Sequence, residues 1–503
     1  IKMIESIVAN ININRGNYNI KASVKTGGVV VSVKGTTTAD MKHSYNIKNV
    51  SKFVLGGTMS LLSMIKHFCL VAAPVTATQV SLILGSFVAV TLTGQYSTVD
   101  LAGMAMGYNL WVAAFFGLTG ILLGVTPIVS HALGTKKTES IASIMWQNVY
   151  LGLIFATCLI IATVSGLSPL LDILGIEPAA KIVCLQYMYA MCVAFPAMMI
   201  MSAFRYIVDA HGNTRYSLYI ISSSVLIQSI GNAIFIPGLG PIPAFGGFGA
   251  GIATVIAYWY MMFCYLGMIT YHKKFKHYHF WSSFTGPSWV LIHDQLSLGI
   301  PIGLSIFAEI SIFSAAGISM ANFGTDIIAA HQAAASFLGV TFSFPLSLSM
   351  ASTIVIAYEL GAKRYEQAIT YTWITRGVAI FIALCIGTYS FTHIDYLAGL
   401  FTNEGHMIPL IESFISYAVF FTIIDALGTP LQGVLRAYRD VTSVSIIAIG
   451  TYWGVTVPVA YLCFLFTDFG PYSVWIGLLT STSTAALCYM YRLRKVQRTL
   501  LTI

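Results

Sequence analysis

The sequence predicts an all-α integral membrane protein with twelve transmembrane helices in two six-helix lobes related by a parallel repeat. The composition points to a membrane, because 57% of the 503 residues are hydrophobic and only 9% are charged, whereas a soluble domain carries about 25% charged residues. The mean hydropathy of +0.79 agrees with this. The other two observations are a series of long apolar runs and a recurrence of the first half in the second.

Twelve apolar runs follow one another along the chain. About 20 apolar residues cross a bilayer as an α-helix, so each run is expected to form one span. In chain order the runs are 68–93, 101–130, 145–168, 183–208, 216–237, 248–271, 296–322, 327–358, 371–391, 408–433, 442–465 and 472–492. The basic segment 273–295 is expected to link two lobes, residues 61–272 and 296–503.

Residues 1–60 differ from the rest of the chain. They are polar, rich in Asn and Thr, and contain neither a spanning run nor the apolar region of a signal peptide. Two interpretations stay open. The segment is either a mobile cytoplasmic tail, or translation starts at Met41 and the residues before it are not part of the native protein.

The basic residues predict the orientation. With the N-terminus inside, Lys181 is the one basic residue between spans on the outer side, which indicates that both termini are cytoplasmic. The net charge of +8 is therefore a topology signal and does not indicate nucleic-acid binding. The loops and ends assigned to the cytoplasm carry Lys136, Lys137, Arg215, Lys273, Lys274, Lys276, Lys363, Arg364, Arg436, Arg439, Arg492, Arg494, Lys495 and Arg498.

No motif for an enzyme, a cofactor or a metal cluster is found. The eight cysteines lie in or beside apolar runs, as small core residues do, and form no disulfide or metal pattern. A P-loop, an HExxH motif and a nucleophile triad are absent, so ATP hydrolysis is not expected. The glycines of "GGFGAG" (246–251) follow no strand and indicate close helix entry.

The two halves of the chain share three pairs of segments at one spacing. "GTKKTES" from 134 matches "GAKRYEQ" from 361, Pro74 matches Pro301, and "RYIVDAHGNTR" from 205 matches "QGVLRAYRDVT" from 432, each 227 residues apart. Three matches without a gap indicate a duplication. Six helices separate the copies, so both halves enter the membrane in the same direction, and a substrate site is expected near the midplane between them.

Five segments carry a family resemblance. They are "DAHGNTRYSLYIISSSVLIQSIGNAIFIPGLGPIPAFGGFGAGIATVIAYW" (209–259), "SIFAEISIFSAAGISMANFGTDIIAAHQ" (305–332), "FPLSLSMASTIVIAYELGAKRYEQA" (344–368), "DALGTPLQGVLRAYRD" (425–440) and "WIGLLTSTSTAALCYMYRLRKVQR" (475–498). Together they resemble the multidrug and toxic compound extrusion (MATE) family, nearest its bacterial NorM-type branch. The resemblance covers about residues 62–500 and implies two six-helix lobes that exchange organic compounds for sodium ions or protons.

Two of the eighteen acidic residues, Glu309 and Asp425, lie well inside apolar runs. Both are expected near mid-membrane in the C-terminal lobe, where no Lys or Arg is expected to pair with them. An unpaired charge there costs about 2.5–3.5 kcal/mol, so binding of a sodium ion or a proton is the functional interpretation. The alternative is a protonated acid that bonds to a neighbouring helix. The resemblance implies that the matching family acids bind the coupling cation and substrates.

The N-terminal lobe lacks such acids. At the repeat spacing Glu309 corresponds to Leu82 and Asp425 to Met198. Many family members carry an Asp in the first helix, and the matching position in "FVAVTLTGQYSTVDLA" (87–102) is Ala89. This departure favours coupling through the C-terminal lobe alone.

Five further residues are candidates for the substrate cavity. Gln332 matches a polar position of the family, Gln228 and Asn232 place two amides on one helix face, and Phe342 and Phe421 offer ring faces to an organic cation. Hydrogen bonding between helices is the alternative for the amides, and plain packing is the alternative for the rings. The neighbouring His331 is expected to be structural.

The favoured function is therefore secondary antiport by alternating access, with small organic cations exported against sodium ions or protons. The alternative is a flippase or exporter of a lipid-linked or other anionic metabolite, which would need basic residues in the central cavity. Neither a receptor nor an enzyme has a site to support it. We expect a monomer embedded in the lipid of a plasma membrane, as in the bacterial inner membrane, with no cofactor and no nucleic acid partner.

Overall fold

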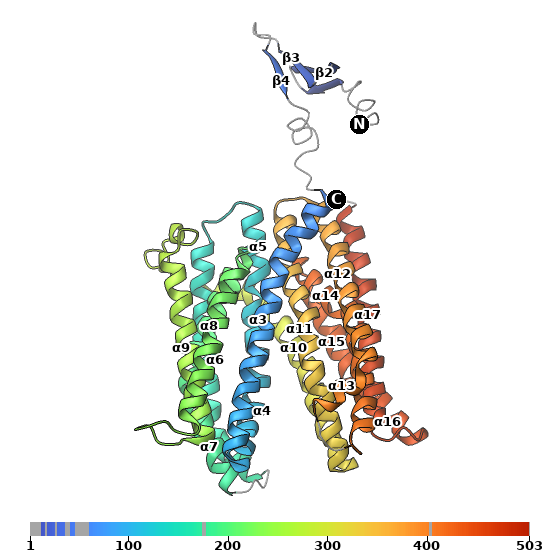
Figure 1. Cartoon of the computed structure of the whole chain (residues 1–503). Coiled ribbons are helices and arrows are strands. Elements are labelled where there is room, and N and C mark those ends of the chain that lie inside the picture. The colour runs from blue at the N-terminus through green and yellow to red at the C-terminus, as the bar shows by residue number, and fades with distance from the viewer. Residues whose placement is uncertain are drawn as a thin grey trace. The chain divides into compact units, whose positions relative to one another are not determined.

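The computed structural model describes residues 60–173, 178–401 and 405–501, together with four short strands nearer the N-terminus (Figure 1). The chain divides into two compact units, residues 1–64 and 65–503, which are described separately.

The first unit contains an antiparallel sheet that the sequence interpretation missed. Its strands are β1 (Asn12–Arg15), β2 (Tyr18–Lys25), β3 (Gly28–Gly35) and β4 (Met41–Tyr45), paired in the order β1-β2-β3-β4. Strands of four to eight residues need no long apolar run, so a search for spans passes over them. The expected all-α architecture accordingly holds for the second unit.

The second unit is helical from end to end (Figure 1). Its N-terminal half consists of α3 (Leu61–Tyr96), α4 (Thr98–Leu123), α5 (Val125–Gly134), α6 (Ile141–Ile173), α7 (Pro178–Ala210), α8 (Thr214–Phe235) and α9 (Gly246–Tyr271). A short helix, η1 (Lys276–Tyr278), follows. The C-terminal half consists of α10 (Trp289–Ser319), η2 (Met320–Phe323), α11 (Thr325–Gly361), α12 (Tyr365–Thr392), α13 (Ile394–Gly399), α14 (Ile408–Ala437), α15 (Val441–Tyr452), α16 (Thr456–Phe466) and α17 (Tyr472–Leu501).

Among the described residues, eleven helical segments are long and apolar enough to cross a membrane. Helices α4 and α5 make one such segment, broken at Gly124, and α15 and α16 make another. The twelfth expected span is present as the 30-residue helix α17, whose run of Ser and Thr at 480–484 and whose basic C-terminal end lower its hydropathy. The chain is a multi-pass membrane protein.

Unusual backbone conformations recur at the repeat spacing. Lys136 and Lys363 have φ angles of 61° and 58°, and Gly212 and Arg439 have φ angles of 72° and 61°. The members of each pair are 227 residues apart. Few residues other than glycine adopt positive φ, so the shared backbone conformation indicates that the two lobes have the same fold.

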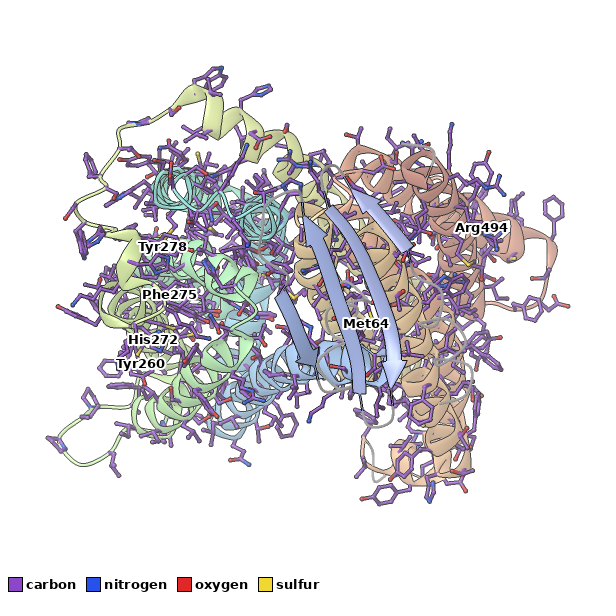
Figure 2. All side chains as sticks on the ribbon, turned by 90° about the horizontal axis from the view of Figure 1, so that it is seen from above. Met64, Tyr260, His272, Phe275, Tyr278 and Arg494 are labelled. Atoms are coloured by element: carbon purple, nitrogen blue, oxygen red, sulfur yellow. The ribbon has the colours of Figure 1, made fainter. Side chains whose placement is uncertain are left out.

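We use the name basic end for the end of the bundle formed by the loops 135–140, 211–213, 272–288, 362–364 and 438–440. The linker between the lobes packs here on the N-terminal lobe, where Figure 2 shows His272, Phe275 and Tyr278, while Arg494 lies on the other lobe. Helix α10 begins at Trp289, inside the segment expected to be linker.

The two lobes contact each other toward the basic end. Helix α4 packs on α10 and α5 packs on α11. A Cβ added to Gly134 would lie 2.1 Å from the carbonyl oxygen of Tyr358, and one added to Gly361 would lie 2.2 Å from that of His131. Gly134 and Gly361 are repeat equivalents, as are His131 and Tyr358. The crossing is therefore nearly symmetric, and it excludes any side chain at its centre.

Candidate functional site

Glu309 and Asp425 come together in the C-terminal lobe. Glu309 lies on α10 and is 6% exposed, and Asp425 lies on α14 and is 1% exposed. They are close enough for the charge of Glu309 to act on Asp425. Two helices of opposite direction thus bring two buried acids within electrostatic range of each other.

Each acid has an oxygen without a protein partner. Thr429, one turn along α14, donates a hydrogen bond to Asp425 Oδ1 at 2.6 Å. Asp425 Oδ2 and Glu309 Oε1 are buried and have no hydrogen-bond partner. Buried polar atoms are nearly always satisfied, so these oxygens mark a candidate site for a cation or a proton.

Arg436 corrects two expectations. The sequence interpretation placed it in a cytoplasmic loop and expected no basic side chain near the acids. Helix α14 instead continues to Ala437, and Arg436 is 3% exposed, close enough for its charge to act on Glu309. Its Nη2 donates to Gln432 Oε1 at 3.2 Å, whereas its Nε has no partner. The run of apolar residues ended before the helix did, which hid Arg436 from a search by hydropathy.

Tyrosine and glutamine side chains complete the surroundings of Glu309. Gln432 and the hydroxyl of Tyr452 on α15 face its carboxyl group. Tyr489 on α17 is also buried and lies close enough to feel the charges of Glu309 and Asp425. The sequence offered no signal for these two tyrosines, because the chain has 27 and most lie in apolar runs.

A second buried charged cluster lies in the N-terminal lobe, which was expected to hold no buried acid. Asp209 on α7 is 6% exposed. Ser217 Oγ donates to Asp209 Oδ1 at 2.6 Å, and Arg205 Nε lies 3.6 Å from Oδ2. Arg205 Nη2 donates in turn to Gln79 Oε1 at 3.2 Å. Asp209 was missed because α7 extends past the apolar run that ended at residue 208.

Glu359 is a further buried acid, 4% exposed, near the C-terminal end of α11. It forms an ion pair with Arg364 across the turn that follows the helix. Like Asp209 it has a basic partner of its own. Glu309 and Asp425 differ in this respect, since the described residues form no ion pair with either of them.

Gln332 and His331 lie on opposite faces of α11. The Gln332 side chain is exposed, and it is not among the groups that act on Glu309. His331 is 5% exposed and packs edge-on against Trp475 and Phe414, with ring centroids 5.6 and 6.4 Å away. The expected structural role of His331 matches this packing.

The two candidate aromatic residues have different surroundings. Phe421 is fully buried and packs edge-on against Phe313 of α10, with ring centroids 5.3 Å apart. Phe342 on α11 is half-buried. The position of Phe421 one turn before Asp425 thus supports the helix pair that carries the acids.

Gln228 and Asn232 lie on α8, away from the acids. Gln228 Nε2 donates to Thr254 Oγ1 of α9 at 3.0 Å, which is the hydrogen bonding between helices given above as its alternative role. Asn232 is fully buried, and neither its Nδ2 nor its Oδ1 has a partner.

The acid pair suits a small cation. Sodium is a hard ion that prefers carboxylate, hydroxyl and carbonyl oxygens, as magnesium and calcium do. Glu309, Asp425, Thr429 and Tyr452 supply such oxygens. The described residues contain no group of three or more His, Cys, Asp or Glu side chains that could hold a metal ion. Tight binding of a multivalent metal therefore finds no support in this part of the chain.

A small cavity lies between the lobes, toward the basic end. Asp209 and Tyr206 line it from the first lobe and Arg436 from the second. Leu123 and Met350 are repeat equivalents, as are Thr126 and Thr353, and all four line it too. The cavity therefore lies on the axis that relates the lobes.

The model of the MatE family matches residues 74–234 and again 301–462, once in each lobe. The NorM protein of Oceanobacillus iheyensis, described as a probable multidrug resistance protein, is 36% identical over 441 residues, which cover 88% of this chain and 99% of the relative. A protein of the same description from Streptococcus pneumoniae is 36% identical over 414 residues, which cover 82% of this chain and 91% of the relative.

Two solved structures share the fold. One is the outward-facing conformation of a multidrug resistance MATE family transporter, with a TM-score of 0.80 and 16% identity over 88% of this chain and 97% of that one. The other is a transporter of the same superfamily from Pyrococcus furiosus, described as having reverse polarity of its binding pocket. Its TM-score is 0.78, with 17% identity over 87% of this chain and 96% of that one.

Proposed function

The chain belongs to the MatE family, and from this premise we propose that it is a multidrug-efflux antiporter that exports organic cations in exchange for sodium ions or protons. The observation that carries the proposal is the pair of buried acids, each of which has one carboxylate oxygen without a hydrogen-bond partner. Two negative charges in an apolar interior are costly, so the site favours a positive occupant.

Exchange follows because the coupling ion and the substrate share one site. A sodium ion or a proton neutralises the acids, and so does the positive group of a substrate. Since both occupants use the same charges, binding of one weakens binding of the other. Alternating access then turns this competition into antiport, because the site opens to one side of the membrane at a time.

The lobe contacts indicate the state of the structure. The lobes meet toward the basic end, through the crossing of Gly134 and Gly361. Basic loops favour the cytoplasmic side, so the proposal places this end and both termini in the cytoplasm, with the lobes in contact on that side. In this proposal the protein acts as a monomer in a plasma membrane.

Arg436 gives a specific reason to keep a second candidate. A carrier of a lipid-linked or other anionic metabolite needs a basic group in its central cavity, and Arg436 lines the cavity between the lobes. Asp209 lines the same cavity, however, and Glu309 and Asp425 together are two acids against the single basic group Arg436. This arrangement favours cationic substrates.

Counterflow in proteoliposomes tests the proposal. A fluorescent organic cation is loaded, and sodium and pH gradients are imposed separately, with Glu309→Gln as the matched variant. We expect either gradient, or both, to drive uptake in the parent and neither to drive it in the variant. Transport of an anionic lipid-linked probe without transport of any cation would support the second candidate instead.

A further inference from the structure

Arg436 lies between the acid pair and the cavity on the lobe axis. Its charge acts on Glu309 and on Tyr489 in its own lobe, and on Tyr206 in the other lobe. It is one of the groups that line the cavity. The charge of Glu309, in its own lobe, therefore acts on the guanidinium, and a second acid, Asp209 of the other lobe, lines the same cavity.

The guanidinium is weakly held where it is. Nη2 donates to the neutral Gln432, and Nε has no partner. A guanidinium carries five N–H donors, and carboxylates bind it in a bidentate manner. The described residues show no ion pair between Arg436 and either acid, so no carboxylate among them fixes the guanidinium in place.

The repeat sharpens this arrangement. Asp209 and Arg436 are repeat equivalents, so the duplicated position carries a negative charge in one lobe and a positive charge in the other. Both line the cavity on the axis. Charges of opposite sign therefore face each other where the lobes must move apart during alternating access.

We propose that Arg436 is a tethered counter-charge that neutralises Glu309 and Asp425 when they hold no cation, and that moves toward Asp209 when a cation binds. The inference rests on the proposed function, since it assumes that the acids hold the coupling ion. Arg436 is then a positioning residue that helps to expel the ion. Its movement toward Asp209 also joins the lobes at the basic end while the ion is bound.

The proposal predicts opposite signs for two substitutions. Arg436→Gln removes the positive charge that competes with the coupling ion for the acids. The apparent affinity for the ion should rise about tenfold, as expected when one nearby charge is removed in a medium of intermediate dielectric constant. The maximal rate of transport should fall, because the ion is released slowly. Asp209→Asn removes the alternative partner, so Arg436 stays with Glu309 and the affinity should fall. A merely structural role would lower affinity in both.

The measurement is ion-dependent uptake of the fluorescent cation into proteoliposomes, with half-saturating ion concentration and maximal rate determined separately. Arg439→Gln is the matched control, because Arg439 lies three residues on, is about half exposed, and pairs with Asp294 at the surface. It removes the same charge from the same end of α14 and should leave the ion affinity unchanged.

Two further variants keep the outcomes separate. Arg436→Lys retains the charge and should keep the affinity within about threefold of the parent; it also serves if Arg436→Gln fails to fold. If either Arg436→Gln lowers the affinity or Arg436→Lys raises it about tenfold, the counter-charge is wrong. If Glu309→Gln retains the parental response to both gradients, the proposed function itself is wrong, whatever the Arg436 variants do.

Discussion

The same helical position has opposite roles in the two lobes. On α7 of the N-terminal lobe, Arg205 and Asp209 form an ion pair at 3.6 Å, with Ser217 donating to Asp209 and Arg205 donating to Gln79, although Arg205 Nε has no hydrogen-bond partner. On α14 the repeat equivalents are Gln432 and Arg436, and the acids beside them, Glu309 and Asp425, keep oxygens without partners. In the first lobe the buried acid thus has an ion-pair partner, whereas in the second lobe the described residues form no ion pair with either acid.

The difference separates stability from exchange. A buried charge with its own partner is part of the folded structure, and removal of either member leaves the other unpaired at a large cost. A buried charge without a fixed partner raises the energy of the empty site, so it favours binding of a mobile ion. Substitutions in the two lobes should therefore differ in kind as well as in size.

The largest expected effect is the loss of ion-driven efflux in Glu309→Gln. The amide keeps the shape but cannot hold a cation or exchange a proton, so coupling should vanish. Removal of the charge also removes an insertion cost of about 2.5–3.5 kcal/mol, so expression should hold or improve. The assay is efflux from vesicles under sodium and proton gradients, scaled to protein amount by immunoblot.

Asp425→Asn serves as the comparison for that result. If the two acids hold one ion, the double variant should be little worse than either single one, because interacting sites are not additive. Strictly additive losses in log rate would mean that the acids act at separate steps. Parental pumping by Glu309→Gln under both gradients would make Glu309 structural.

The next largest effect is expected in the N-terminal lobe, and on stability. Arg205→Met leaves Asp209 buried without its basic neighbour, and breaking a buried pair in this way costs about 3–5 kcal/mol. Thermal unfolding in detergent measures the loss. The double variant Arg205→Met with Asp209→Leu should recover part of it, since an apolar pair replaces the ionic one. A single variant as stable as the parent would show that the ion pair does not contribute to stability.

Much of this comparison between the lobes could not be predicted from the sequence. The spans, the repeat and the two deepest acids follow from hydropathy and spacing, since an acid inside a long apolar run is conspicuous. Asp209 and Arg436 were missed because each lies just past its apolar run, where a helix end and a loop look alike in the sequence. The tyrosines around Glu309 come from α15 and α17, far away in the sequence, and only tertiary packing brings them together.

The contact between the lobes offers a smaller, conformational test. Gly361→Leu places a side chain against the backbone of His131, 2.2 Å from its carbonyl oxygen at the Cβ alone. The clash should make the conformation with a closed basic end unfavourable, which shifts the population toward a state that is open at that end. Labelling of a cysteine introduced at Ile354, which lines the cavity between the lobes and is 5% exposed here, should then rise several-fold.

Gly339 provides the control for that substitution. It lies on the same helix, α11, and a Cβ there would meet no atom within 4 Å. Gly339→Leu should therefore leave both labelling and transport at the parental level. Equal labelling in the two leucine variants would show that the glycine crossing does not hold the basic end closed.

The smallest expected effect concerns how each lobe holds the loop after its fourth spanning helix. In the N-terminal lobe His211 Nδ1 donates to Ile207 O at 2.7 Å, so the neutral Nε2 accepts from Tyr278 of the linker at 2.9 Å. Burial lowers the pKa of His211 to about 4. The equivalent residue in the other lobe is Tyr438, whose hydroxyl accepts from Gln497 of α17. The loop of the N-terminal lobe is thus held by a histidine, and the loop of the C-terminal lobe is held by a tyrosine and a glutamine.

The sign of the pH dependence follows from that pKa. Released from the linker, His211 has a pKa near 6.5, so docking of its neutral form is fully favourable above that value and weakens as the pH falls toward 4. Between pH 7 and pH 5 the linker should lose roughly 1–2 kcal/mol of docking free energy, seen as faster hydrogen exchange in residues 275–286. The loop that carries Tyr438 should exchange at rates that change only with the intrinsic chemistry. His211→Gln should abolish the difference between the lobes, and a difference that persists in this variant would place the titrating group elsewhere.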